Sequence, residues 1–247
     1  MTPEPYRADA GLGAKLRRRY ARLVHRRPAR LDLARPTVSF TFDDAPASAA
    51  TAAAILERHA ARGTYYLCAG LFDETGHMGR YINAAEASDL AARGHELGCH
   101  SHGHIDAHRS GGDTLVDDSE RNVAALTALG GSARHFAFPY GEVSPAAKAR
   151  LTGRYGSLRG VHAGLVREGS DLNQLPAVGI EGDDGEVVAR RWIDRAVETR
   201  SWLILFTHDV SDTPSPWGCT PEALDRLAAY AQMAGCDLKT VGEVLDR

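Results

Sequence analysis

Two clusters of ionisable side chains in this 247-residue chain have the residue types of a hydrolytic metal site. Asp43 and Asp44 end the run VSFTFDD, and His100 and His104 come directly after the run ELGC. Two histidines and one carboxylate are a common ligand set for a divalent metal that activates water. One aspartate could therefore bind the metal while the other removes a proton from a water molecule. The spacing of the histidines predicts a helical turn that places both rings on one side.

Other assignments of these residues stay open at the level of sequence. His102 and His108 are alternative ligands, and the histidine cluster as a whole could be a surface patch with incidental metal affinity. A pair of aspartates at the end of a strand can also cap the following helix. Cys99 could be a sulfur ligand, although a small buried strand residue is the simpler interpretation.

Two further segments place polar groups directly after apolar strands. In FAFPYG, the proline and the glycine predict a tight turn after the strand. This turn would aim the backbone N–H of Tyr140 toward the ends of the strands, where such a donor can stabilise an oxyanion. His208 follows the strongly apolar run WLILF, and an imidazole there could act as general acid toward a leaving amine. Each signal is weak alone, because turns of this kind and structural histidines are common.

The elements that must position these groups follow a regular pattern. After Pro36, short β-rich runs alternate with alanine-rich stretches that carry apolar residues every three or four positions. This pattern predicts βα units, whose functional groups collect at the carboxyl ends of parallel strands. The predicted strands are 37–42, 64–68, 95–99, 135–138, 157–160, 174–180 and 202–207, with a further candidate at 237–241. The predicted helices are 49–62, 84–93, 114–129, 145–151, 186–200 and 221–234. Their expected caps are Asn83, Ser144 and Thr220 at N-termini, and Gly63, Gly94 and Gly130 after C-termini.

Taken in order, the segments TFDD, HSHGH, FPYG and LFTH resemble the sequential motifs of the polysaccharide deacetylase family, also known as NodB-homology or carbohydrate esterase family 4 enzymes. The resemblance implies an α/β fold, an irregular (β/α) barrel of about seven parallel strands, which agrees with the predicted strands. It also implies a divalent metal, with zinc as the default and cobalt, nickel, manganese or iron as alternatives. The roles that it assigns are Asp43 as general base, Asp44, His100 and His104 as metal ligands, and His208 as general acid.

The chain departs from the family at the third motif. Many members carry an arginine two residues before the proline, where it orients the catalytic base, and this chain has Ala137 there. Arg134, Arg154 or Arg159 could supply the charge from elsewhere, or the base could be tuned without it.

The family's fourth motif, whose aspartate supports the catalytic histidine, is not recognisable either. Asp183, Asp184 and Asp209 are the candidates for that carboxylate, and the position of Asp209 next to His208 favours it. Ser101 lies between the ligands that the resemblance implies, so we expect it to be a supporting hydrogen-bond residue.

Composition sets the cellular context that we expect. The net charge of -3 gives no nucleic-acid signature, and four widely spaced cysteines without a CxxC pair fit a reducing compartment. We therefore predict a cytoplasmic protein with a basic arm over residues 1–36 and a catalytic domain over 37–247. Residues 15–35 interleave Leu16, Tyr20 and Leu23 with cations, a pattern open to weak contact with an anionic membrane surface or to packing on the domain.

The expected function is metal-dependent removal of the N-acetyl group from an amino sugar in a glycan or glycan precursor, so the expected partner is an N-acetylated sugar. Trp217, in the loop after His208, could stack on a sugar face or pack its own loop. The alternatives within the family are a deformylase and a cyclic amidase. From other classes, the alternatives are a catalytically silent carbohydrate-binding domain and a metal-storage or metal-sensing protein.

Overall fold

Residues 11–246 are described by the structure, a computed structural model, and within them eight parallel strands form one curled sheet. Seven of these strands follow the order β7-β6-β5-β2-β1-β9-β8, and β10 pairs with the start of β1. Their bounds are β1 (Thr37–Asp44), β2 (Thr64–Leu67), β5 (Glu96–Cys99), β6 (His135–Ala137), β7 (Ser157–Arg159), β8 (Val178–Gly179), β9 (Trp202–Thr207) and β10 (Asp237–Leu238). The predicted α/β barrel of about seven parallel strands is confirmed.

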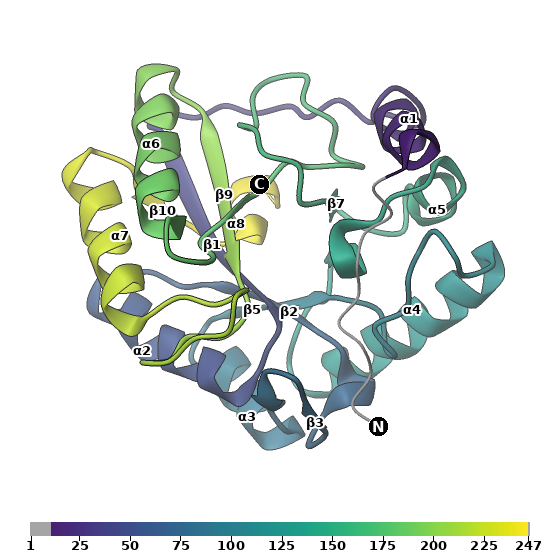
Figure 1. Ribbon diagram of the computed structural model, residues 1–247, viewed down its shortest axis with the longest axis horizontal. Helices are drawn as coiled ribbons and strands as arrows, with labels where there is room; N and C mark the ends of the chain where they lie inside the picture. Colours follow the sequence, from purple (N-terminus) through teal and green to yellow (C-terminus); the bar gives the residue numbers. More distant parts are fainter. Residues whose placement is uncertain (1–10, 247) are drawn as a thin grey trace.

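Helices surround this sheet on its outer face (Figure 1). The covering helices are α2 (Ala50–Arg58), α3 (Ala84–Ala92), α4 (Gly112–Ala128), α5 (Pro145–Leu151), α6 (Gly185–Glu198) and α7 (Pro221–Met233). Each one corresponds to a predicted helix. Because every strand in the order is parallel to its neighbours, all carboxyl ends of the strands lie at one rim.

The barrel is closed irregularly, since β7 and β8 are the two ends of the strand order. The segment between them fills this gap, and the N–H of Gly160 donates to the carbonyl oxygen of Leu175 (3.0 Å). The prediction of one continuous strand over 174–180 is wrong, because only Val178–Gly179 is strand. Pro176 has no N–H to donate to a ladder and separates the two parts.

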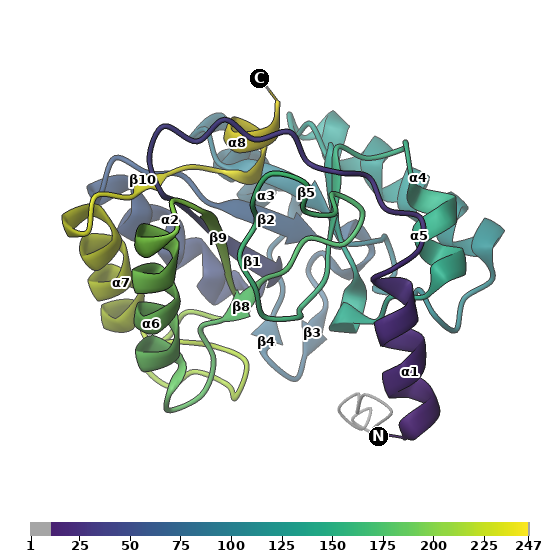
Figure 2. The same cartoon turned by 90° about the horizontal axis from the view of Figure 1, so that it is seen from above.

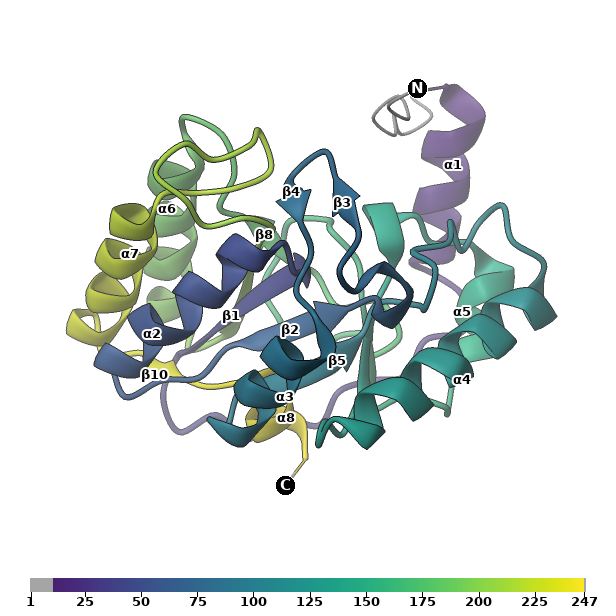
Figure 3. The same ribbon diagram turned by 90° about the horizontal axis from the view of Figure 1, so that it is seen from below.

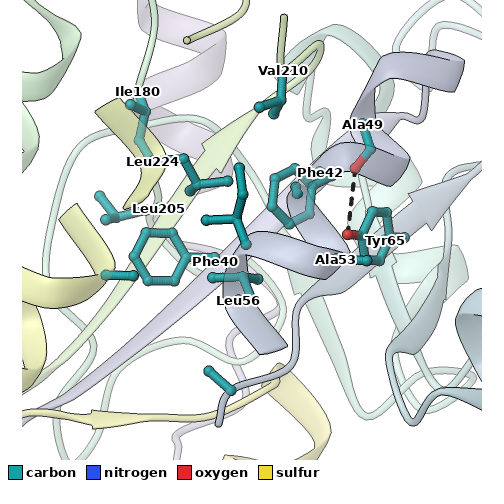
Figure 4. Packing of buried hydrophobic residues seen from close by; sticks show 14 of the residues in the cluster. Phe40, Phe42, Ala49, Ala53, Leu56, Tyr65, Ile180, Leu205, Val210 and Leu224 are labelled. Atoms are coloured by element: carbon teal, nitrogen blue, oxygen red, sulfur yellow. Dashed lines mark hydrogen bonds between the residues drawn. The ribbon is translucent and has the colours of Figure 1, made fainter. Parts of the chain in front are cut away.

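β1 lies in the middle of the sheet and directs its side chains alternately to the two faces. Val38, Phe40 and Phe42 pack in the large core beneath the outer helices, as Figure 4 shows for the two phenylalanines. The side chains of Ser39 and Asp43 leave the other face of the strand and point to the inside of the barrel. The strand therefore carries a buried carboxylate to the interior of the rim.

Most predicted helix ends are confirmed. The side chains of Asn83, Ser144 and Thr220 each accept a hydrogen bond from a backbone N–H in the first turn of their helices. Gly94 and Gly130 follow α3 and α4 with φ of 84° and 90°. The prediction for Gly63 is wrong, because α2 ends at Arg58 and the left-handed residue is Ala60, with φ 53°.

The sequence did not predict several smaller elements. These are α1 (Leu12–Ala21), the antiparallel hairpin of β3 (Thr75–Gly76) and β4 (Gly79–Arg80), and α8 (Val241–Leu245). α1 projects on the same side of the molecule as this hairpin (Figures 2 and 3). The chain after α1 then crosses the barrel to β1, and the N–H of Ala29 donates to the carbonyl oxygen of Ser170 (2.7 Å) on the way. None of the helices within residues 11–246 is long and apolar enough to cross a membrane.

Candidate active site

Asp44, His100 and His104 bring one candidate ligand atom each to a common point at the carboxyl ends of β1 and β5. The Oδ1 atom of Asp44 lies 3.3 Å from Nε2 of His100 and 3.0 Å from Nε2 of His104. Ligand distances of about 2.0–2.2 Å in a tetrahedral zinc site separate neighbouring ligand atoms by roughly 3.4 Å. The three side chains therefore have the spacing of groups that can share one ion.

The two histidines converge through a loop, and the predicted helical turn is wrong. Ser101 and His104 have left-handed backbones, with φ of 61° and 50°, which a right-handed helix does not contain. The Oγ atom of Ser101 accepts a hydrogen bond from the N–H of Ile105 (3.0 Å), so Ser101 supports the loop as expected. Asp118 on α4 accepts another from the N–H of His102 (2.6 Å). Strained backbones held in place by such contacts are typical of functional sites.

The orientation of His100 suits a metal ligand. Its Nδ1 donates to the carbonyl oxygen of Ala137 (2.8 Å), which leaves the lone pair of the ring on Nε2, the atom that faces Asp44. The ring of Tyr140 packs edge-on against His104, with 4.4 Å between ring centroids. Both imidazoles are thus positioned by neighbouring elements.

The carboxylate of Asp44 fits a cation best. It is buried, and its Oδ1 makes no hydrogen bond to any residue within 11–246. Burial alone would raise the pKa of Asp44, but the imidazoles of His104 and His100 outweigh it and hold that pKa well below its usual range. An ionised, buried and unsatisfied oxygen next to two imidazole nitrogens is the donor set expected for a divalent metal.

The alternative ligands lie elsewhere. A Cβ atom at Gly70 would be 2.5 Å from Nδ1 of His102, so this ring packs against Gly70. The metal-ligand group found among the described residues includes neither His102 nor His108. Cys99 is buried in the core beside Phe136, and burial raises the pKa of its thiol, as expected for a structural cysteine.

Asp43, next to the ligand group, is held by a buried arginine. The Nη2 atom of Arg159 donates to both carboxylate oxygens of Asp43, at 2.6 and 2.5 Å. Arg159 is fully buried, and its guanidinium lies 5.0 Å from the ring centre of Tyr66 and 5.3 Å from that of Phe206. These contacts fix the orientation of the Asp43 carboxylate.

Among the three candidate arginines, Arg159 is therefore the one that reaches Asp43. Arg134 is instead paired with Asp246, and Arg154 with Glu120. Arg159 on β7 is the register partner of Ala137 on β6. The resemblance implies an arginine at position 137 on β6, and the guanidinium comes instead from Arg159 on the neighbouring strand, β7.

His208 has a carboxylate partner that the sequence did not predict. The Oε1 atom of Glu181 lies 3.2 Å from Nδ1 of His208. Burial lowers the pKa of His208, but Glu181 and the charges of Asp44 and Asp43 outweigh it and raise that pKa to about 9. The ring is therefore protonated at neutral pH and can donate a proton.

The predicted partners of His208 have other places. Asp209 accepts hydrogen bonds from the N–H (2.8 Å) and Oγ (2.5 Å) of Ser215 and so shapes the following loop, while Asp183 and Asp184 are exposed. A signal for Glu181 did exist in the sequence, because this residue directly follows the predicted strand 174–180.

Two further site segments are placed by their neighbours. Tyr140 has a left-handed backbone (φ 59°) in the turn after β6, and its side chain is 41% exposed, so the residue borders solvent at the rim. Trp217 packs edge-on against His77 of the β3–β4 hairpin, with 5.0 Å between ring centroids. Its carbonyl oxygen accepts a hydrogen bond from the N–H of His208 (3.1 Å), so the loop of Trp217 also supports this histidine.

The sequence model of the polysaccharide deacetylase family matches residues 30–155, just over half of the chain. The chain belongs to the polysaccharide deacetylase family. No curated protein matches its sequence. The match covers the aspartate pair, both candidate ligand histidines and the turn of Tyr140, whereas His208 and Glu181 lie beyond it.

Solved structures share the fold of this polysaccharide deacetylase family member. The chitin deacetylase from the fungal pathogen Colletotrichum lindemuthianum is 16% identical, with a TM-score of 0.64 over 87% of this chain and 90% of that chain. A family 4 acetyl xylan esterase from Clostridium thermocellum, in complex with a cobalt ion, is 21% identical, with a TM-score of 0.59 over 85% and 90%. A family 4 pseudoenzyme from Bacillus anthracis is 18% identical, with a TM-score of 0.60 over 87% and 67%. At these identities the likeness establishes the fold alone.

Proposed function

We propose that this polysaccharide deacetylase family member is a metal-dependent hydrolase that removes the N-acetyl group from an amino sugar in a glycan or glycan precursor. The observation that carries the proposal is the convergence of Asp44, His100 and His104 at one rim, with Asp43 beside them. Carboxylates and imidazoles that are fixed close together can bind a metal ion and can also transfer protons during hydrolysis.

The ligand group would hold the ion through Asp44, His100 and His104. When bound, a divalent cation there polarises the amide carbonyl and acidifies water. Zinc is the default for two imidazoles and one carboxylate, and cobalt, nickel, manganese and iron suit the same ligands. The unsatisfied Oδ1 of Asp44 supports this assignment.

The other residues would move protons and hold charge. Asp43, oriented by Arg159, accepts the proton of the attacking water. Attack forms a C–O bond to the acetamide carbon and a tetrahedral oxyanion, to which the backbone N–H of Tyr140 donates. His208 gives its proton to the sugar nitrogen as the C–N bond breaks, so that acetate and the free amine leave.

Two alternatives differ from this proposal in substrate or in turnover. A formamido sugar or a cyclic amide would be hydrolysed by the same residues. A silent carbohydrate-binding domain is the alternative from another class, and a pseudoenzyme does share the fold. Asp43 is held by Arg159, and Nδ1 of His208 contacts the carbonyl oxygen of Trp217 beside Glu181. These contacts favour an active enzyme, because neither sugar binding nor metal storage needs a positioned base and acid.

Product analysis tests this function. We expect the metal-loaded protein to release acetate from N-acetylated amino sugars, to stop after removal of the metal by a chelator, and to recover with added zinc or cobalt. Enzymatic assays for acetate and formate, run in parallel, make the measurement. Formate from N-formylated sugars alone would support the deformylase, and neither product from metal-loaded protein would support the silent domain.

The pH dependence of kcat tests the role of His208. A general acid must be protonated, so kcat should fall as pH rises through the pKa of His208, which Glu181 raises. Glu181→Gln removes a group that raises this pKa, so the alkaline limb should move to lower pH. Asp183→Asn, an exposed change of the same kind two residues away, is the matched control and should leave the limb in place. An unmoved limb in Glu181→Gln would rule out this pair as the source of the alkaline pKa.

We also propose a cytoplasmic location and a weak contact of residues 15–35 with an anionic membrane surface. The free cysteines Cys68, Cys99, Cys219 and Cys236 fit a reducing compartment. Leu16, Tyr20 and Leu23 are 59%, 57% and 70% exposed and follow a helical spacing beside arginines, which favours the membrane contact. Co-sedimentation with vesicles that contain anionic lipid, and none with neutral vesicles, is the expected result.

A further inference from the structure

A cavity of about 220 Å³ lies beside the proposed active site, at the ends of β6 and β7. Its lining residues are Arg22, Gly141, Val143, Gly160, Val161, His162 and Gln174. Gly141 directly follows Tyr140, and Gly160 directly follows Arg159, so the cavity begins one residue away from two parts of the site. Pockets that enclose a whole small molecule measure about 300–1,000 Å³. The cavity therefore suits one substituent of a substrate whose amide lies in the active site.

A buried lysine fixes the residue that precedes Arg22, a cationic residue of this cavity. Lys148 is fully buried, and its Nζ donates to the carbonyl oxygen of Ala21 (2.8 Å) at the end of α1. Nζ of Lys148 also contacts Asp171 (2.5 Å), so the charges of these two residues offset each other. Because Ala21 is itself fully buried, Arg22 follows a residue that is fixed in the core. Arg22 lines the cavity with its side chain exposed to solvent, so its positive charge lies at the cavity.

Two further side chains offer hydrogen bonds there. The Nδ1 atom of His162 is buried and has no hydrogen-bond partner within residues 11–246. Burial and the charges of Arg22 and Lys148 lower the pKa of His162 to about 4, so the ring is neutral at pH 7 and offers one N–H. The Oε1 atom of Gln174 lies 3.5 Å from Nζ of Lys148, which directs the amide NH₂ of Gln174 away from this lysine.

We propose that this cavity is a subsite for a phosphate group carried by the substrate sugar, bound by Arg22, His162 and Gln174. The inference rests on the proposed function and narrows its substrate to a sugar phosphate, hence to a glycan precursor. The three side chains come from three separate segments, and a phosphate presents three acceptor oxygens, whereas a carboxylate presents two in one plane. A guanidinium is also the preferred partner of phosphate in proteins.

Substrate preference is the first test. We compare kcat/KM of the metal-loaded protein for N-acetylglucosamine 1-phosphate and for the neutral methyl glycoside of N-acetylglucosamine. We expect a preference of about tenfold or more for the phosphate, the effect of one charge-assisted hydrogen bond. Arg22→Gln should bring the ratio close to one, while Arg30→Gln, an equal loss of charge at an exposed site on the same arm, should keep it. Equal rates on both substrates, or a ratio that survives Arg22→Gln, would overturn the subsite.

Two more substrates test which carrier bears the phosphate group. A nucleotide diphosphate sugar and a lipid-linked sugar phosphate in vesicles present the same chemistry from different carriers. Whichever shows the higher kcat/KM, with loss in Arg22→Gln, identifies the carrier.

Binding of inorganic phosphate separates this inference from the proposed function. By calorimetry, His104→Ala should bind phosphate as the wild type does, and Arg22→Gln should bind it about tenfold more weakly. Phosphate binding that disappears in His104→Ala would place the anion on the metal and refute the subsite. Binding that depends on Arg22 without hydrolysis of either sugar would refute the proposed function and leave the subsite standing.

Discussion

Replacing Asp43 with asparagine is expected to lower kcat of the proposed hydrolysis by about 100- to 10,000-fold, the usual contribution of a positioned general base. Asparagine keeps the size of the side chain and an oxygen that can accept from Arg159, but it cannot take a proton from water. Asp43 lies outside the group of three candidate ligands, so the variant should still bind its metal. Loss of turnover with metal retained is the expected signature.

The measurement pairs kcat with metal content by atomic emission, and His104→Ala is the matched variant. His104 supplies one of the three candidate ligand atoms, so its removal should lower both metal content and kcat. Hydrolysis at the wild-type rate in Asp43→Asn would contradict the proposed mechanism. Metal retained in full by His104→Ala would contradict the ligand set.

The architecture could be predicted from the sequence because its elements have strong local signals. β9 (Trp202–Thr207) and α5 (Pro145–Leu151) match their predicted bounds to the residue, since WLILF is a continuous apolar run and Ser144–Pro145 is a typical helix start. Elements without such signals were not predicted. The hairpin of β3 and β4 has only two residues in each strand, too few for a period of two to show.

The convergence of the site residues was predictable in outline and not in detail. Parallel strands bring their carboxyl ends to one rim, so Asp44, His100 and His104 meet there as expected. Their local conformation was not predictable from spacing, because the left-handed backbone of Ser101 depends on contacts such as the one between His102 and Asp118, sixteen residues later. Long-range contacts of this kind leave no periodic pattern.

The partners of the proposed base and acid show a second limit. Arg159 is 116 residues away from Asp43 and was one of three candidate arginines that the sequence could not separate. Glu181 is 27 residues before His208, and proximity along the chain pointed to Asp209 instead. β8 pairs with β9, which places Glu181 beside His208, and the curl of the sheet brings Arg159 of β7 to Asp43 of β1. Both partners do follow the rule that polar groups collect at strand ends.

The register of β6 and β7 predicts that the arginine can be moved between strands. Ala137 and Arg159 are paired neighbours, about 4.8 Å apart in a sheet, and their side chains leave the same face. Arg159→Ala leaves the carboxylate of Asp43 buried without its cation, so it should cost about 3–5 kcal/mol of stability and most of kcat. Ala137→Arg alone should also destabilise the protein, because it adds a second buried cation to a filled interior.

In the double variant Ala137→Arg/Arg159→Ala, each change should offset the defect of the other. The space left by Arg159 receives the new side chain, and the guanidinium can again contact Asp43, so the double variant should be more stable and more active than either single variant. Urea unfolding and kcat make the comparison, with Arg134→Ala, which breaks an exposed pair with Asp246, as a control expected to cost at most about 1 kcal/mol. The opposite result is a double variant whose losses of stability and of log kcat equal the sums of the losses in the two single variants. That result would show that Asp43 needs its arginine on β7, and that the positions are not interchangeable.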